Sequence, residues 1–197
     1  MTHSNVIYTS FLSKTKTILF VISILTVFGT VTELLGGIWD ASTHALREPE
    51  KFWTIQHLTI YTGVGSVVSS AVLGLIIMFL NYENKVLFKG IKIILLGSIL
   101  QLVGGYTDSL SHEIYGIDGL VTPSHITIEA GLFFSALGGF ITLCQIDKIK
   151  TSKIMPVAIL TVILSISWIG FNLILLFASV ILCIPVYGLF SSGCAVL

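Results

Sequence analysis

The chain has 197 residues, of which 54% are hydrophobic and 10% are charged, and its mean hydropathy is +0.99. Ten Lys and Arg residues balance ten Asp and Glu residues, so the basic surplus typical of a nucleic-acid-binding protein is missing. This composition excludes an ordinary soluble domain. It predicts one integral membrane domain over residues 1–197, with the lipid bilayer as its surroundings and no nucleic-acid partner.

Long apolar runs predict the membrane-spanning helices, because a spanning helix needs about 20 predominantly apolar residues. Four runs reach that length, at 17–39, 54–80, 87–107 and 126–146. They predict an all-α fold, a polytopic transmembrane helical bundle.

The C-terminal region adds further apolar sequence. No charged residue follows Lys153, and we expect residues 154–190 to form two short spans that turn near Gly170-Phe171-Asn172. The alternative for this region is one long tilted helix followed by an interfacial tail. With two short spans, the bundle has about six helices.

The positions of the lysines predict the orientation of the helices, because short loops rich in Lys and Arg face the cytoplasm. Lysines gather in the N-terminal tail and near the second and fourth connections: Lys14, Lys16, Lys85, Lys89, Lys92, Lys148, Lys150 and Lys153. The only Lys or Arg residues in the connections 40–53 and 108–125 are Arg47 and Lys51. We therefore expect a multi-pass protein of the cell membrane with a cytoplasmic N-terminus and these two connections near the extracytoplasmic face.

One polar pattern, Asp-x3-His-x12-His, occurs twice, 68 positions apart, with no insertion or deletion. Its two copies consist of Asp40, His44 and His57, and of Asp108, His112 and His125. Four of the five histidines in the chain belong to these copies. The same offset aligns Leu35-Gly36-Gly37 with Val103-Gly104-Gly105.

This duplication predicts two internal repeats, at about 30–80 and 98–148, each forming a helical hairpin. Both hairpins begin on the same side of the membrane, so we expect parallel repeats related by a pseudo-two-fold axis along the membrane normal. The paired glycines before each Asp predict close helix packing.

The repeated residues have the chemistry of metal ligands. An Asp and a His four residues apart on a helix share one face, and the second His of each copy comes from the next helix. One carboxylate and two imidazoles, with open positions left for water or substrate, suit Cu, Zn or non-haem Fe better than Mg or Ca. Helix caps or side chains wetted by headgroups explain a single copy equally well, but two ungapped copies favour metal binding.

Three more polar residues are expected to support these ligands: Glu33, Gln101 and Glu129. Glu33 lies seven residues before Asp40, and Gln101 occupies the matching place in the second copy. Ionisable residues at membrane depth are functional candidates, as partners of the ligands or as proton carriers. Aromatic residues near the helix ends, Trp53 and Tyr61 among them, are interpreted as an interfacial belt with no cofactor role.

The repeated motif resembles the copper-site motif of the C subunit of the copper membrane monooxygenases, the family of particulate methane monooxygenase and ammonia monooxygenase. In that family an Asp/His/His set on adjacent transmembrane helices forms one copper site, and a following Asn/His/His set forms a neighbouring one. The resemblance covers about residues 33–131 and matches the two copies to these two sets, with Asp108 in the place of the Asn.

The resemblance implies a copper-binding subunit that works with other membrane subunits and oxidises a small substrate, such as ammonia or a light hydrocarbon, with O2. The resemblance is also consistent with a divergent homologue of this subunit that works alone. Two other functions fit the same residues. One is a non-enzymatic protein that stores, hands over or senses copper or zinc at the extracytoplasmic side, and the other is an accessory scaffold. Whether the chain is an enzyme stays open, and no catalytic residue is assigned.

Overall fold

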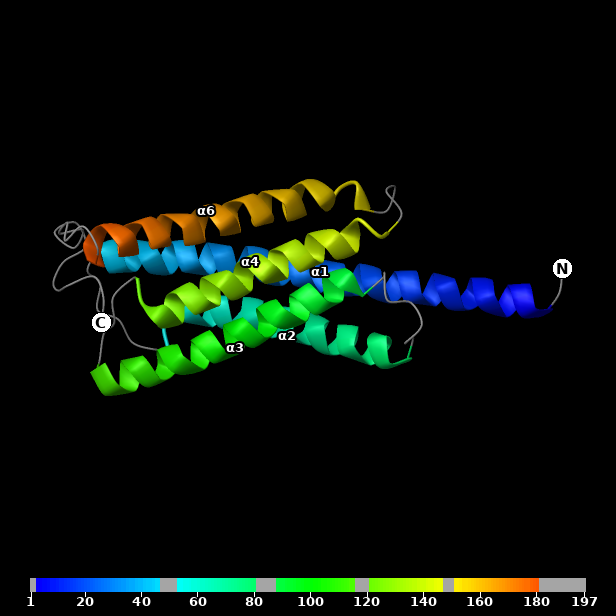
Figure 1. Cartoon of the computed structure of the whole chain (residues 1–197), viewed down its shortest axis with the longest axis horizontal. Helices are drawn as coiled ribbons and strands as arrows, with labels where there is room; N and C mark the ends of the chain where they lie inside the picture. The colour runs from blue at the N-terminus through cyan, green and yellow to red at the C-terminus, as the bar shows by residue number, and fades with distance from the viewer. Residues whose placement is uncertain (1–2, 47–52, 81–87, 116–120, 147–150, 181–197) are drawn as a thin grey trace.

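The structure is a computed structural model that describes residues 3–46, 53–80, 88–115, 121–146 and 151–180. The described residues form a bundle of long helices (Figure 1). The helices are α1 (His3–Leu46), α2 (Ile55–Leu80), α3 (Lys89–Tyr115), α4 (Pro123–Leu143) and α6 (Met155–Val180). All five are long and apolar enough to cross a membrane, which confirms the predicted helical architecture for the described residues and supports a multi-pass membrane protein.

The first four predicted spans coincide with helices of the structure. The membrane-spanning stretches there are Thr15–Thr43, Ile55–Leu80, Lys89–Ser111 and Pro123–Leu143. Local sequence explains where α4 begins, because the Thr122 hydroxyl accepts a hydrogen bond from the His125 backbone N–H at 3.2 Å and Pro123 occupies the first turn. This cap fixes His125 in the first turn of α4.

The predicted turn near Gly170 is wrong, because residues 170–172 lie inside α6, which runs without a break from Met155 to Val180. A glycine inside a helix costs only about 1 kcal/mol relative to alanine. Opening the helix in a membrane would leave backbone N–H and C=O groups without partners, which costs several kcal/mol for each group. Residues 181–190, where the second short span was expected to end, lie outside the described residues.

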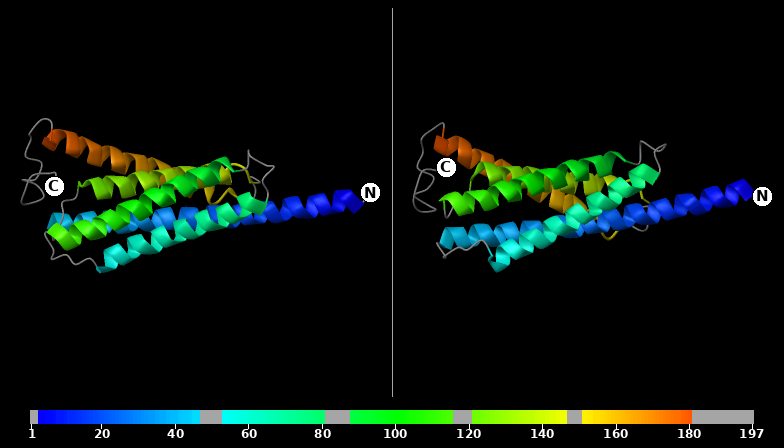
Figure 2. Two further views of the ribbon diagram at one scale, coloured as in Figure 1. Left: turned by 60° about the horizontal axis from the view of Figure 1, so that its bottom comes forward. Right: turned by 90° about the horizontal axis from the view of Figure 1, so that it is seen from below.

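The helices pack in neighbouring pairs. α1 packs most extensively against α2, and α3 against α4. α6 lies on α4 and also touches α1, while α2 contacts α3 (Figures 1 and 2). α1 and α3 therefore end, and α2 and α4 begin, at the same end of the bundle, which is also where the C-terminal half of α6 lies.

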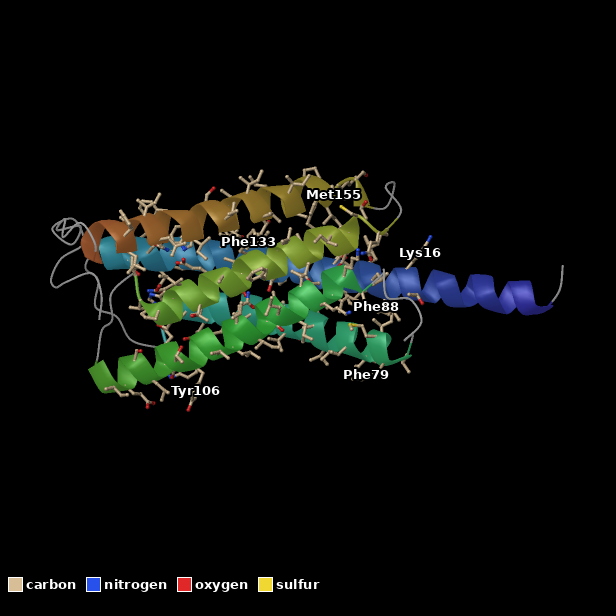
Figure 3. All side chains as sticks on the ribbon, in the orientation of Figure 1. Lys16, Phe79, Phe88, Tyr106, Phe133 and Met155 are labelled. Atoms are coloured by element: carbon tan, nitrogen blue, oxygen red, sulfur yellow. The ribbon has the colours of Figure 1, made fainter. Side chains whose placement is uncertain are left out.

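The distribution of polarity is that of a membrane protein. Large apolar side chains project outward, as Phe79 does with 83% of its surface exposed (Figure 3). The interior contains many small hydroxyl side chains, such as Thr26 and Ser70, whose oxygens lie 2.8 Å apart between α1 and α2. Small and hydroxyl-bearing residues let helices approach closely and hydrogen-bond across the interface in a bilayer.

In both copies the first glycine of the pair lies at a tight helix contact and the second does not. A Cβ added at Gly36 would lie 2.7 Å from Ile60 Cγ1, and a Cβ added at Gly104 would lie 2.7 Å from Ile128 Cγ1. The glycine that follows each of them has nothing within 4 Å. The predicted close packing is therefore confirmed for the first glycine of each pair.

Candidate functional site

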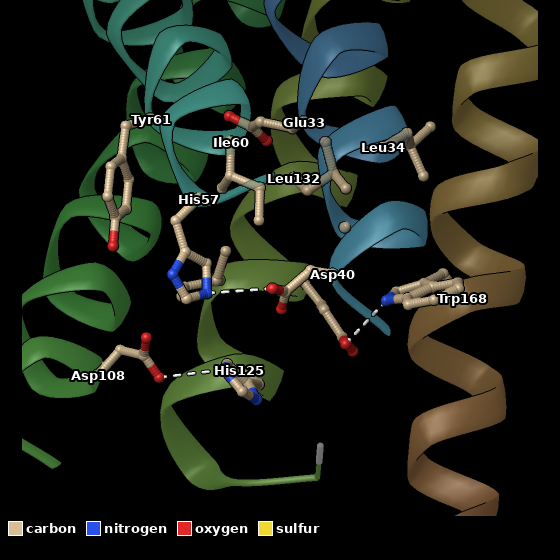
Figure 4. A pocket seen from close by; sticks show the side chains of 13 residues that line it. Glu33, Leu34, Asp40, His57, Ile60, Tyr61, Asp108, His125, Leu132 and Trp168 are labelled. Carbon is tan, nitrogen blue, oxygen red and sulfur yellow. Dashed lines mark hydrogen bonds and ion pairs between the residues drawn. The ribbon is translucent and has the colours of Figure 1, made fainter. Parts of the chain in front are cut away.

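A cavity of about 90 Å³ lies between the helices at the end of the bundle where α1 and α3 end (Figure 4). Its polar lining includes four carboxylates and two imidazoles, those of Glu33, Asp40, Asp108, Glu129, His57 and His125. Apolar side chains such as Leu34, Leu132 and Trp168 form other parts of its wall. The cavity thus brings together four of the six predicted metal ligands and two of the three predicted supporting residues.

The first Asp/His pair connects the end of α1 with the start of α2. His57 Nε2 lies 3.1 Å from Asp40 Oδ1, and both residues are buried (Figure 4). Beside them, the Gln56 amide donates to the Thr43 hydroxyl at 3.2 Å, which ties the same two helix ends together. Asp40 and His57 are therefore held by the packing of α1 on α2.

The second pair has the same geometry. His125 Nε2 lies 3.1 Å from Asp108 Oδ1, which joins the start of α4 to the end of α3 (Figure 4). The Ser124 hydroxyl also donates to Asp108 Oδ1, at 2.9 Å, and lies 2.8 Å from the Thr122 hydroxyl. The residues that cap α4 therefore also hold the carboxylate of the pair.

The structure describes the side chains of two of the three residues in each triad. The backbones of His44 and His112 lie in α1 and α3, one turn beyond Asp40 and Asp108, but their side chains lie outside the described part. Among the side chains that are described, no three from His, Cys, Asp and Glu lie close enough to hold one ion. Metal binding by the triads stays a prediction.

The pair geometry is compatible with metal ligation. Two ligands that each lie about 2.0–2.2 Å from one ion are roughly 2.8–3.6 Å apart, when the angle between them at the ion is between a right angle and the tetrahedral angle. The 3.1 Å between nitrogen and oxygen in each pair falls at this separation. A carboxylate next to a ring nitrogen is equally the usual partner that orients a histidine whose other nitrogen binds the metal. The donor set therefore fits a metal such as copper or zinc.

Glu33 and Gln101 meet directly, although they lie 68 positions apart. The Gln101 amide donates to Glu33 Oε2 at 2.9 Å, and only 3% of Glu33 and 1% of Gln101 is exposed. This hydrogen bond links α1 to α3 about 10 Å deeper along the helix than Asp40, given the rise of 1.5 Å per residue. Gln101 is thus a partner of Glu33, and Glu33 is the member of this pair that lines the cavity.

Glu129 is held by α6. Its Oε1 accepts hydrogen bonds from the Trp168 indole N–H, at 2.9 Å, and from the Asn172 side-chain amide. Sequence reasoning missed Trp168 and placed Asn172 at a turn. A signal was present, because Asn172 is the only Asn among residues 154–190 and follows Trp168 by four positions, which places both on one helix face.

Tyr61 has a place in the cavity that its interpretation as interfacial belt did not anticipate. Its ring stacks on the His57 imidazole, with centroids 6.2 Å apart and planes 29° apart. Trp53 packs edge-on against the Tyr61 ring, with the two ring centroids 6.2 Å apart. Tyr61 therefore lines the cavity and restricts the orientation of His57.

The fold and the site define the class of the protein as a multi-pass helical membrane protein with a cavity lined by carboxylates and imidazoles. In comparisons with known proteins, no family model, no curated protein and no solved structure matches the chain. Membership of the copper membrane monooxygenases stays a prediction from the motif.

Proposed function

We propose that this chain is a multi-pass membrane protein that binds a transition metal, copper in the first place, in the cavity at the ends of α1 and α3. The observation that carries the proposal is that each copy of Asp-x3-His-x12-His contributes an Asp/His pair to that one cavity. His44 and His112 complete the two triads. Zinc and non-haem iron are the other metals that this donor set suits.

Buried charge gives the physical reason for a cation. The cavity collects four carboxylates at membrane depth, where an uncompensated charge is expensive. A buried carboxyl group either takes up a proton or needs a cation nearby, and a bound metal ion is that cation in this proposal. His57 and His125 would have to be deprotonated at the nitrogen that holds the metal, so metal binding would be weaker at low pH.

The two hairpins are, in this proposal, parallel repeats around a pseudo-two-fold axis along the membrane normal. Its support is that contacts recur at one offset, with equal distances in the two Asp/His pairs and with Glu33 and Gln101 in direct contact. Parallel repeats of this kind place their shared site at the interface between the repeats.

The cavity is proposed to open toward the extracytoplasmic side of the cell membrane. Lys16 near the start of the α1 span, Lys89 at the start of α3 and Lys153 before α6 belong to the opposite end of the bundle. Lysine-rich ends remain in the cytoplasm during insertion. The N-terminus is accordingly proposed to be cytoplasmic.

The finer form of the proposal is that the bound copper serves the oxidation of a small substrate with O2, in a complex with other membrane subunits. Its support is the resemblance of the two triads to the copper motif of the membrane monooxygenases. Copper supplies the redox chemistry when it is bound. The chain itself holds Asp40 beside His57 and Asp108 beside His125, and Glu33 and Glu129 lie where they can exchange protons with the cavity.

Metal analysis tests the proposal. The full-length chain, produced with copper and purified in detergent, should retain copper. Elemental analysis by inductively coupled plasma mass spectrometry measures the copper content. The variants His57→Gln/His125→Gln and His44→Gln/His112→Gln should lose it, because each removes one ligand from both triads. His3→Gln is the matched control and should retain the wild-type content, since His3 lies outside both motifs. Copper content that is absent in the wild type or unchanged in both double variants would contradict metal binding.

Oxygen consumption separates the enzymatic form from the non-enzymatic one. Copper-loaded membranes that contain the chain and its partner subunits, supplied with a reductant that provides the two electrons of a monooxygenation, should consume O2 when ammonia or a light hydrocarbon is added, and the double histidine variants should not. Copper that is retained without substrate-dependent O2 consumption would favour storage, transfer or sensing of the metal.

A further inference from the structure

One polar contact joins the two hairpins across the middle of the bundle. α1 and α3 both pack on α2 and on α4, and the side chains of Glu33 and Gln101 meet between these four helices. Matching glycines make room for them. An added Cβ at Gly63 would lie 2.6 Å from Glu33 Cγ, and one at Gly131 would lie 2.7 Å from Gln101 Cγ. The packing of all four helices therefore holds this pair in place.

Each side chain of the pair has one oxygen or nitrogen that is satisfied and one oxygen that is not. Gln101 Nε2 donates a hydrogen bond to Glu33 Oε2 at 2.9 Å. Glu33 Oε1 and Gln101 Oε1 are both buried and have no hydrogen-bond partner among the residues that the structure describes. Because buried polar atoms in proteins are nearly always hydrogen-bonded, two such oxygens on one pair point to a missing donor.

The described helices offer no basic side chain as that donor. α1 carries no Lys or Arg after Lys16, α3 carries none after Lys92, and α2, α4 and α6 carry none at all. The titratable groups that line the cavity together with Glu33 are Asp40, His57, Tyr61, Asp108, His125 and Glu129. Only the two histidines can be positive, and each lies 3.1 Å from the Asp of its own hairpin. An ionised Glu33 would thus be a costly buried charge.

We propose that Glu33 and Gln101 form a proton-binding site at the inner end of the cavity, in which Glu33 is a neutral carboxylic acid at neutral pH. A protonated carboxyl group has one O–H donor. The proton on Glu33 Oε1 donates to Gln101 Oε1, while Glu33 Oε2 accepts from Gln101 Nε2. One proton thereby removes the buried charge and satisfies both unpartnered oxygens.

The site also gives the cavity a proton to release. Glu33 lines the cavity, so a cation that enters the cavity favours the charged form of this carboxyl group. The O–H bond of Glu33 then breaks, its electron pair stays on the carboxylate, and the proton leaves through the cavity to water. This release rests on the proposed metal binding, whereas the proton site of the metal-free protein does not.

Infrared spectroscopy tests the proton site in the metal-free protein. The full-length chain in lipid nanodiscs at neutral pH should show the C=O stretching band of a protonated carboxyl group, which is separate from the bands of ionised carboxylates. Glu33→Gln should lower the intensity of this band, because glutamine keeps the shape of the acid and can form both hydrogen bonds to Gln101. An equal band in the wild type and in this variant would overturn the proposal.

Matched variants assign the band to the pair. Glu33→Gln/Gln101→Glu exchanges the two side chains and should restore the lost intensity, and a folded double variant without it would overturn the pairing. Glu113→Gln removes an exposed carboxylate of α3 and should leave the band unchanged. If Glu33→Gln does not fold, Gln101→Leu decides the question. The acid then loses its acceptor, so its band should shift to higher frequency, and an unshifted band would overturn the proposal.

Zn(II) binding tests the release of the proton. Calorimetry in two buffers of different ionisation enthalpy gives the number of protons released for each Zn(II) bound, and the wild type should release about one more than Glu33→Gln. Equal release from these two proteins, when both bind Zn(II), would overturn the release. A wild-type chain that binds no Zn(II) would instead overturn the proposed metal binding, and the infrared band would still decide the proton site.

Discussion

Replacing Gly131 with alanine is expected to destabilise the bundle by about 1–3 kcal/mol, the usual cost of overpacking a tight core. A Cβ at this position of α4 would lie 2.7 Å from the Gly97 carbonyl oxygen and 2.8 Å from the Gln101 backbone nitrogen, both in α3. Backbone atoms cannot rotate away as a side chain can, so the two helices must separate. That separation would also displace Gln101 from Glu33.

Gly105→Ala is the matched control for this prediction. Gly105 also lies in α3, yet an added Cβ there has nothing within 4 Å. Alanine is a better helix former than glycine by about 1 kcal/mol, so this variant should be neutral or slightly stabilised. Thermal unfolding in detergent, followed by circular dichroism, measures both. A Gly131→Ala variant as stable as Gly105→Ala would show that α3 and α4 do not pack as closely as described.

Replacing Asp108 with alanine is expected to cost about 3 kcal/mol of unfolding free energy in the metal-free protein. Asp108 is 6% exposed and accepts a hydrogen bond from Ser124 at 2.9 Å, while His125 Nε2 lies 3.1 Å away. Its removal takes away the oxygen that both the buried Ser124 hydroxyl and the half-buried His125 ring contact. It also frees the end of α3 from the first turn of α4.

The control for this variant is Glu113→Ala, which removes a carboxylate from the same helix at an exposed position. A surface change of this kind usually alters stability by no more than about 0.5 kcal/mol. Unfolding of the metal-free variants in detergent gives the comparison. If Asp108→Ala and Glu113→Ala were equally stable, the buried pair would not contribute to holding the two helix ends together.

The membrane-spanning helices could be predicted from the sequence because a single physical requirement controls them. A segment that crosses the bilayer must be apolar along its length and must satisfy its backbone hydrogen bonds internally. Both conditions are local, so α1 to α4 follow from the apolar runs alone. The turn expected near Gly170 fails for the same reason, since turn-forming residues do not open a helix where no water can replace its hydrogen bonds.

The Asp/His pairs were likewise within reach of the sequence. The spacing placed one member of each pair near the end of a helix and the other near the start of the next, and the structure brings Asp40 to His57 and Asp108 to His125. Spacing along one hairpin could not reveal that both pairs line a single cavity. That depends on how α2 packs on α3 and α4 on α1, which involves contacts between residues far apart in the chain.

The sequence by itself determined the membrane class, four of the helices and the identity of the residues that pair within each hairpin, because these depend on composition and on short spacings. Only the tertiary structure decided that Gln101 donates to Glu33 and that α6 brings Trp168 and Asn172 to Glu129. These contacts join residues on different helices. Helix packing sets them, and in a bilayer such packing comes from close fit and hydrogen bonds that no local pattern encodes.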